Sequence, residues 1–307
     1  MNFIYSNDNK RYHTLSYYNK QKYGEKVLKA SVNAGLTCPN IDGTLGVGGC
    51  IYCEGGSGYF TNKTLSVKEQ IALEFKRQTK PFKNHKFIVY FQANTNTYTD
   101  IKTLEKMAND ALSFENVVGI TFSTRTDCVD DEKIAFLQEL NQKTDVCVEF
   151  GLQSVHNKTL KFINRCQTYE SFEKEYLNFK KSGIRSCIHI INSLPGETYD
   201  MMLQTAIKVG KLNPEGLKIH SLHISKGTKL AKIYQEKPFD LIDKNTYIKL
   251  VANQLTYIQP TTVIERLTGD GDKQKLIAPN WSKDKISVLG GIDKYMAEND
   301  LFQGKNL

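Results

Sequence analysis

Residues 117–152 read VVGITFSTRTDCVDDEKIAFLQELNQKTDVCVEFGL, and this stretch holds one strand–helix–strand unit. Its two ends, residues 117–123 and 145–152, are short runs rich in β-branched and aromatic residues, as strands are. The segment between them, DDEKIAFLQELNQ, opens with acidic residues, which are favourable at the positive end of a helix dipole. The stretch therefore predicts a parallel βαβ unit with a right-handed crossover.

The same alternation of short and long elements extends along most of the chain. Strands are expected at residues 27–32, 86–92, 117–123, 145–152, 186–192 and 216–224. Helical patterns lie between them, and one opens with a capping box from Ser66 to Glu69 while another ends before Gly183. Six repeats predict an α/β fold, a partial (β/α)6 TIM-type barrel over residues 27–235, with an open doubly wound sheet as the alternative. Reactive groups of such barrels lie at the carboxyl ends of the strands.

Two further segments flank this repeat. Residues 236–307 predict a C-terminal α/β extension packed on the barrel, with a helix in 239–260 and a short strand in 261–268. Residues 1–26 form a basic and aromatic N-terminal extension that either contacts RNA or is a solvated tail. This extension has no apolar core of a signal peptide, and no run of 18 apolar residues occurs. We expect a cytoplasmic protein with no membrane partner.

The charge balance is basic. The chain has 41 Lys and Arg residues against 33 Asp and Glu, a formal net charge of +8. This excess suits a polyanionic partner, although many cytosolic proteins are mildly basic for solubility alone.

Three of the seven cysteines lie in one glycine-rich segment, GLTCPNIDGTLGVGGCIYCEGGSG, at residues 35–58. The thiolates of Cys38, Cys50 and Cys53 can bind three irons of a [4Fe–4S] cluster, and the fourth iron stays open for a ligand that is not protein. The glycines between them let backbone N–H groups approach the sulfides. Structural zinc is the alternative, but it prefers four closed ligands, and no second pair of Cys or His follows at finger spacing.

The chain resembles the bacterial radical S-adenosylmethionine (SAM) proteins related to the radical SAM half of the elongator catalytic subunit. Their cysteine segment has this long first gap. The resemblance continues through YFQANTNTY (90–98), STRTDCVDDE (123–132), VEFGLQSVHNKTL (148–160), SLPGET (193–198), KIHSLHISKGT (218–228), ERLTGDG (265–271), IAPNWS (277–282) and FQGK (302–305). Two departures are Thr126, where relatives commonly have proline, and Asn94, where an aromatic residue is frequent.

The resemblance implies a [4Fe–4S] cluster and SAM as cofactors, and it suggests which residues contact SAM. Tyr52 would lie against the adenine, and polar groups near the ends of the fourth and fifth strands would hold the ribose and adenine. Arg125 either binds the SAM carboxylate or pairs with Asp127. The expected SAM contacts are Tyr52, Gly55, Gly56, Ser57, Arg125, Glu149, Gln153, Ser154, Asn192 and Pro195.

Other residues have weaker signals. Cys128, Cys147 and Cys187 are expected to be small buried residues in or near strands. His189 is expected in the core, whereas His220 and His223 either pack there or face the pocket. Cavity-lining or substrate roles are open for Tyr90, Gln92, Asn96, Arg266, Thr268 and Asp270.

Taken together, the sequence predicts a radical SAM enzyme that generates a 5′-deoxyadenosyl radical, with Cys38, Cys50 and Cys53 as the cluster ligands and a flavodoxin or ferredoxin as electron donor. The elongator-like resemblance suggests tRNA as substrate. Because only about 70 residues follow the barrel, with no acetyltransferase half, we expect remodelling of an existing substituent on the wobble uridine. The specific hypothesis is conversion of 5-carboxymethylaminomethyluridine to 5-aminomethyluridine. The alternatives are a peptide or small-metabolite substrate, or a zinc-stabilised nucleic-acid-binding module without turnover.

Overall fold

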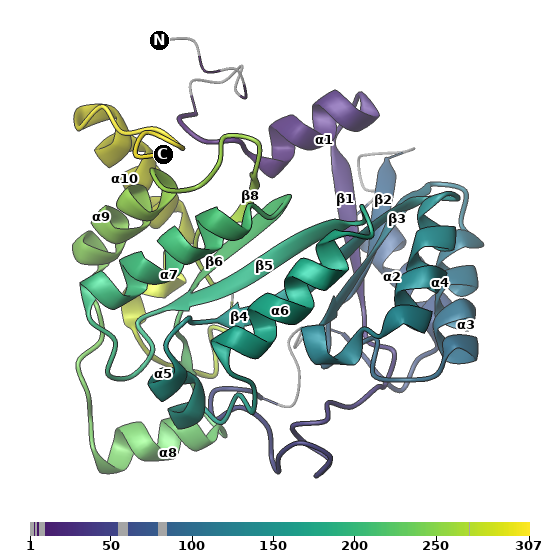
Figure 1. Ribbon diagram of the computed structural model, residues 1–307, viewed down its shortest axis with the longest axis horizontal. Helices are drawn as coiled ribbons and strands as arrows, with labels where there is room; N and C mark the ends of the chain where they lie inside the picture. Colours follow the sequence, from purple (N-terminus) through teal and green to yellow (C-terminus); the bar gives the residue numbers. More distant parts are fainter. Residues whose placement is uncertain (1–2, 4, 6–9, 55–60, 79–84, 270) are drawn as a thin grey trace.

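A seven-stranded parallel sheet organises the chain in the computed structural model, which describes residues 3, 5, 10–54, 61–78, 85–269 and 271–307 (Figure 1). Its strands stand in the order β1-β2-β3-β4-β5-β6-β8. Their bounds are β1 (Val27–Val32), β2 (Lys86–Phe91), β3 (Val117–Thr124), β4 (Asp145–Gln153), β5 (Arg185–Asn192), β6 (Gly216–Ser221) and β8 (Val263–Arg266). Each neighbouring pair is parallel, so every carboxyl end lies at the same edge of the sheet.

The helices between the strands lie on the outer side of the curved sheet (Figure 1). They are α2 (Val67–Gln78), α3 (Ile101–Leu112), α4 (Asp131–Asn141), α5 (Asn157–Phe162), α6 (Tyr169–Lys180) and α7 (Tyr199–Leu212), with a 3-10 turn at Thr126–Cys128. Several begin at a side-chain cap: Asp100, Asp130, Thr168 and Thr198 each accept a hydrogen bond from a backbone N–H of the first turn. Ser66 and Glu69 form the predicted capping box before α2.

The two faces of the sheet differ in chemistry because successive strand side chains point to opposite sides. Toward the helices the strands present buried apolar residues, such as Phe91 and Phe122, whose rings stack at 5.1 Å. Burying a side chain of this size contributes about 1.5–3 kcal/mol. Toward the inside of the curve they present polar and charged residues, including Tyr90, Glu149 and Lys218. The cavity of the barrel lies on the polar side of this sheet.

The C-terminal part supplies the seventh strand. It contains α8 (Lys229–Glu236), α9 (Lys244–Leu255), β8, β9 (Leu276–Ala278), a 3-10 turn at Asn280–Lys283 and α10 (Lys285–Glu298). β8 pairs in parallel with β6, and α9 packs between α7 and α10. The expected α/β partial barrel is confirmed, but the strand expected at 261–268 joins its sheet, so the barrel has seven strands and not six. The expected strand 216–224 is also split: β6 ends at Ser221, and β7 (Ile224–Ser225) pairs antiparallel with β9.

The sheet does not close on itself, and α1 (Leu15–Tyr23) lies where β1 and β8 would meet. The backbone N–H of Ile264 on β8 donates to the carbonyl of His13 at 2.7 Å, and Tyr12 is buried in the core. Gln303, 1% exposed, holds this junction by accepting from the His13 N–H and donating to two backbone carbonyls. The described part of the N-terminal extension is therefore packed against the barrel, which corrects the expectation of a solvated tail.

Among the helices that the structure describes, none has the length and apolar character needed to cross a membrane. The division into residues 1–26, 27–235 and 236–307 stays a prediction.

Candidate functional site

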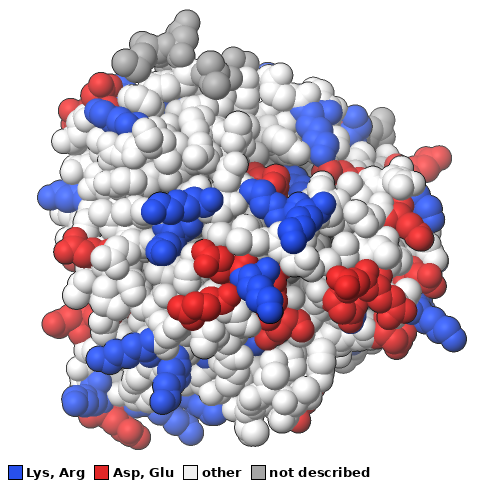
Figure 2. All heavy atoms as spheres, in the orientation of Figure 1, with Lys and Arg blue, Asp and Glu red and all other residues white. Residues whose placement is uncertain are grey.

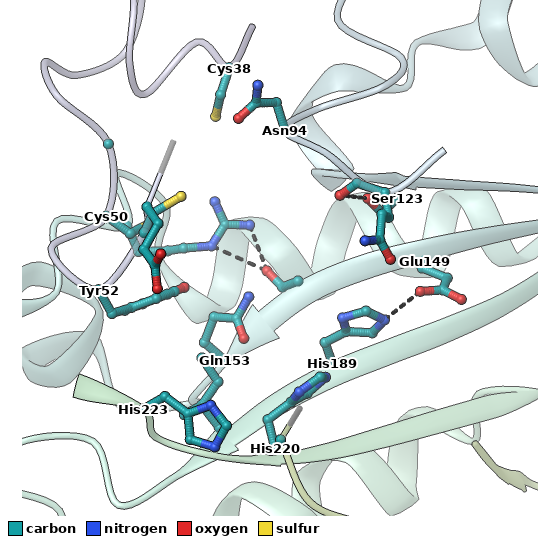
Figure 3. A pocket seen from close by; sticks show the side chains of 18 of the residues that line it. Cys38, Cys50, Tyr52, Asn94, Ser123, Glu149, Gln153, His189, His220 and His223 are labelled. Atoms are coloured by element: carbon teal, nitrogen blue, oxygen red, sulfur yellow. Dashed lines mark hydrogen bonds and ion pairs between the residues drawn. The ribbon is translucent and has the colours of Figure 1, made fainter. Parts of the chain in front are cut away.

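A cavity of about 380 Å³ opens at the carboxyl ends of the strands, inside the curve of the sheet (Figure 3). Its wall combines the cysteine segment with residues from β2 to β6 and from β8. Most of the side chains singled out in the sequence meet here: Cys38, Cys50, Tyr52, Cys53, Tyr90, Gln92, Arg125, Glu149, Gln153, His189, His220, His223 and Arg266. This is the place where barrels of this class keep their reactive groups.

The cysteine segment folds back on itself, so that the long gap before Cys50 becomes a small hairpin. The N–H groups of Gly48 and Gly49 donate to the carbonyls of Ile41 and Asn40, and both glycines have φ of 75°, a conformation that side chains disfavour. The side-chain amide of Asn40 lies 3.5 Å from the sulfur of Cys50 and also donates to the carbonyl of Asn164. The hairpin thus brings Cys38 and Cys50 to one hollow, toward which both sulfur atoms point (Figure 3).

Tyr52 and two arginines surround this cysteine end of the cavity. Burial and the nearby Cys50 raise the pKa of Tyr52 well above its usual value, so its hydroxyl stays protonated. Arg165 donates to the carbonyl of Gly151 at 2.6 Å. Arg125 makes a two-point contact with Asp127 and also donates to the carbonyl of Arg165 at 2.9 Å. The ion pair that was one of the two expectations for Arg125 is therefore present.

The inner wall of the barrel carries a buried ionic cluster centred on Glu149. One oxygen of Glu149 accepts from Tyr90 at 2.6 Å, His189 at 2.8 Å and Lys218 at 2.5 Å. Burial alone would raise the pKa of Glu149, but the charges of Lys218 and Lys29 outweigh it and hold the pKa well below its usual range. Glu149 is therefore ionised, and it fixes the positions of Tyr90, His189 and Lys218.

A second carboxylate extends the cluster. Glu265 on β8 lies 2.6 Å from Arg185, 3.1 Å from Lys29 and 3.8 Å from Lys218. Although burial acts to raise its pKa, the charges of Lys29, Arg185 and Lys218 lower the pKa of Glu265 to about 2. The lysines of β1 and β6 thus bridge two ionised carboxylates across the inside of the barrel.

Two known protein families match parts of this chain. Residues 45–209 match the radical SAM superfamily, and residues 214–298 match the radical SAM C-terminal domain.

The chain belongs to the radical SAM superfamily.

Similar proteins span almost the whole chain. It is 41% identical to protein YtqA of Bacillus subtilis over 305 residues, which are 99% of this chain and 95% of YtqA. It is 32% identical to protein YhcC of Escherichia coli, covering 94% of this chain and 92% of YhcC. Among solved structures, the archaeal Elp3 of Methanocaldococcus infernus shares the fold, with a TM-score of 0.66 and 17% identity over 90% of this chain and 64% of Elp3. The chain is thus a YtqA/YhcC-type radical SAM enzyme, distantly related to Elp3.

Membership of this superfamily implies a [4Fe–4S] cluster and SAM, and the donor set in the cavity fits such a cluster. Cys38, Cys50 and Cys53 line the same wall. Within the described ranges, no three Cys, His, Asp or Glu side chains converge closely enough to hold one metal ion. A closed zinc site would need such convergence, whereas each cysteine ligand of a cluster binds a different iron. The assignment of these three thiols as ligands remains a prediction.

The remaining expected SAM contacts divide into three groups. Tyr52, Arg125, Glu149 and Gln153 lie on the cavity wall, and Gly55, Gly56 and Ser57 lie outside the described residues. Ser154, Asn192 and Pro195 are not on that wall. The hydroxyl of Ser154 contacts Glu197, and the amide of Asn192 exchanges two hydrogen bonds with that of Gln254. The structure does not bring these three side chains to the cavity.

Of the residues with weaker signals, three histidines face the cavity and three cysteines do not. His189, His220 and His223 all line its wall, and the rings of His189 and His220 lie 5.3 Å apart. His189 lines the cavity, and its ring also has a hydrogen-bond partner in the buried Glu149, as a core histidine would. The expected burial of Cys128, Cys147 and Cys187 is confirmed. Asn96 is buried away from the cavity, where its amide donates to backbone carbonyls.

Sequence reasoning missed five charged residues whose hydrogen bonds and ion pairs join the strands around the cavity, namely Lys29, Arg165, Arg185, Lys218 and Glu265. A signal was present for two of them. Lys29 and Lys218 interrupt otherwise strand-like runs, VLKASV and GLKIHS. Charged residues are almost never buried in strands unless they are paired, so a lysine at such a position indicates a buried carboxylate. Which carboxylate it meets depends on strand order, which the sequence does not state.

Proposed function

We propose that this radical SAM enzyme remodels the C5 side chain of a wobble uridine in tRNA, converting 5-carboxymethylaminomethyluridine to 5-aminomethyluridine. The observation that carries the proposal is the sign of the charge inside the barrel. The cysteines lie at one end of the cavity, and Glu149 and Arg266 lie on its wall beyond them. Behind that wall, the cations Lys29, Lys218 and Arg185 outnumber the carboxylates Glu149 and Glu265 with which they pair. Such a wall suits a substrate side chain that ends in a carboxylate.

Relationship and net charge support tRNA as the carrier of that side chain. The fold is shared with archaeal Elp3, and the net charge of +8 suits a polyanion. On the face shown in Figure 2, basic and acidic side chains are interspersed, so charge does not single out an RNA-binding surface on that face. Binding to tRNA is expected to weaken steeply with salt, because neutralised phosphates release counterions.

In the proposed reaction, Cys38, Cys50 and Cys53 would hold the cluster and Tyr52 would lie against SAM. When bound, these cofactors supply a 5′-deoxyadenosyl radical that removes a hydrogen atom from the substrate. The protein contributes a lined cavity that keeps water away from this chemistry, with Tyr90, His189 and Lys218 held in place by Glu149. The overall reaction balances when one water molecule is taken up and the carboxymethyl unit leaves as glyoxylate. The substrate then loses two electrons, and conversion of SAM to methionine and 5′-deoxyadenosine takes up two.

The enzyme is proposed to work in the cytoplasm. Radical SAM enzymes need an external reductant, and we propose a flavodoxin or ferredoxin that delivers its electron at the cysteine segment.

The proposal is tested first by nucleoside mass spectrometry of tRNA from a deletion strain. The carboxymethylaminomethyl form should accumulate and the aminomethyl form should fall. Unchanged amounts of both would reject the proposed substrate. With the purified protein reconstituted anaerobically, SAM, reductant and such tRNA should yield 5′-deoxyadenosine, glyoxylate and the aminomethyl nucleoside in equal amounts.

Matched cysteine variants test the ligand assignment. Cys38→Ala, Cys50→Ala and Cys53→Ala should each lose the visible absorbance and most of the iron. Cys166→Ala is the control, because Cys166 is half-buried and free but is not on the cavity wall. A Cys50→Ala protein with four irons and four sulfides per chain would refute the assignment.

A further inference from the structure

The wall of the cavity holds one arginine that no described residue pairs with. Arg266, at the end of β8, lies on the cavity wall, and among the described residues no hydrogen bond or ion pair of its guanidinium is found. Its neighbour Glu265 is already engaged with Arg185 and Lys29. A half-buried arginine on a cavity wall with no partner among the described residues is available to bind an anion that enters the cavity.

The charges near Arg266 also favour binding of an anion. Behind the cavity wall, Lys29, Lys218 and Arg185 form their ion pairs with two carboxylates of the described part of the chain, Glu149 and Glu265. This cluster therefore has one extra positive charge before Arg266 is counted. Two other acidic residues lie on the described cavity wall. Glu54 pairs with Lys275 at 3.3 Å, and Asp272 accepts from the backbone N–H of Gln274. No ion pair of either residue with Arg266 is found, so these carboxylates do not neutralise Arg266.

A second unpartnered group lies beside this cation. The Nε2 atom of His220 on β6 is buried and, among the described residues, has no hydrogen-bond partner. Burial, and then the charge of Arg266, lower the pKa of His220 well below its usual value, so the ring is neutral near pH 7. A neutral imidazole protonated on Nε2 is a hydrogen-bond donor. His220 lies far from Cys38 in the view of Figure 3, at the other end of the cavity.

We propose that Arg266 and His220 bind the carboxylate of the substrate side chain at the inner end of the cavity. The inference rests on the proposed function, and it adds the residues that select a carboxylate-bearing uridine. Arginine presents two parallel N–H donors that match a carboxylate, and His220 supplies a third donor from the neighbouring strand. A bound carboxylate neutralises the extra charge and satisfies Nε2 of His220. The carboxylate of SAM would not serve here, because the cluster that would hold SAM is expected at Cys38, Cys50 and Cys53, at the other end of the cavity.

The first experiment compares two nucleosides that differ only in the carboxymethyl group. Dissociation constants of 5-carboxymethylaminomethyluridine and 5-aminomethyluridine are measured by equilibrium dialysis with the reconstituted enzyme and saturating SAM. The native enzyme should prefer the carboxylated nucleoside at least tenfold. Arg266→Gln should abolish the preference, and Arg266→Lys, which keeps the charge without the fork, should retain part of it.

The control is Lys294→Gln, which removes one positive charge from α10, where the lysine side chain is 75% exposed. This variant should keep the native preference. If Arg266→Gln also keeps it, or if the native enzyme binds the two nucleosides equally, the carboxylate site is wrong.

A second measurement separates this inference from the choice of substrate. If the native enzyme binds neither nucleoside, the proposed uridine substrate fails, and N-methylglycine serves as a small carboxylate probe in the presence of SAM. Its binding should raise the pKa of His220, followed by NMR of labelled histidine and assigned with His220→Asn, because a nearby anion favours the charged ring. The rise should be absent in Arg266→Gln. No rise in the native enzyme would overturn the site independently of the reaction.

Discussion

Replacing Glu265 by glutamine removes a charge that pairs with three cations, one buried and two partly buried. The side chain is 1% exposed and lies within 4 Å of Arg185, Lys29 and Lys218. The fall of its pKa from 4.5 to about 2 corresponds to about 3 kcal/mol of stability, at about 1.4 kcal/mol per pKa unit. Removing one partner of a buried ion pair costs about 3–5 kcal/mol, which agrees. Glu265→Gln should therefore lower the free energy of unfolding at pH 7 by about 3 kcal/mol.

The measurement is urea unfolding of the native protein and the variant, followed by circular dichroism. Glu298→Gln on α10 is the control, because that carboxylate is 60% exposed and its contact with Lys294 is worth less than about 1 kcal/mol. The depressed pKa also sets the pH dependence. Glu265 contributes its full stability above about pH 4.5 and loses it as the pH falls toward 2, so the native protein and the variant should converge in that window. A difference below 1 kcal/mol at pH 7 would refute the reasoning.

Two further changes test packing and the ionic cluster. Gly210→Ala should destabilise the protein by about 1–3 kcal/mol, because the added Cβ would lie 2.0 Å from the carbonyl oxygen of Tyr257. Gly290→Ala, in a helix with nothing within 4 Å of the added Cβ, should be neutral or stabilising. Equal urea midpoints for the two variants would contradict the packing argument. Tyr90→Phe should cost about 1.5–3 kcal/mol in the same assay, because its hydroxyl donates to the ionised Glu149, and an unchanged free energy of unfolding would exclude a contribution from that bond.

The alternation of strands and helices could be predicted because each strand of the barrel is a short local pattern. The expected strand at 27–32 has the observed bounds, and that at 145–152 ends one residue early. The seventh strand was harder, because its four residues pair with β6 after an intervening stretch that holds two helices. Its place in the sheet depends on contacts with β6 and α1, which are distant in the chain and which periodicity does not reveal.

At the site, the cysteines could be predicted from spacing, whereas the inner wall could not. Three cysteines in a glycine-rich segment carry their chemistry in the sequence itself. The contacts of Glu149 with Lys218 and of Glu265 with Lys29 join strands that are 69 and 236 residues apart in the chain. Such contacts follow from strand order and register. The sequence therefore indicated that Glu149 is a polar residue within a strand, but it did not indicate which cations pair with it.

The contacts that Gln303 makes with the N-terminal segment can form only late in protein synthesis. Gln303 contacts the backbone of Arg11 and His13, which are made about 290 residues earlier. At about 5–20 residues per second, roughly 15–60 seconds pass on the ribosome before these partners can meet. During that interval the segment around α1 lacks the strand β8 that it lies against, and its backbone lacks the bridge from Thr14 to Ile264. An unpaired strand edge invites other chains, so this end of the nascent protein is where we expect a chaperone to bind.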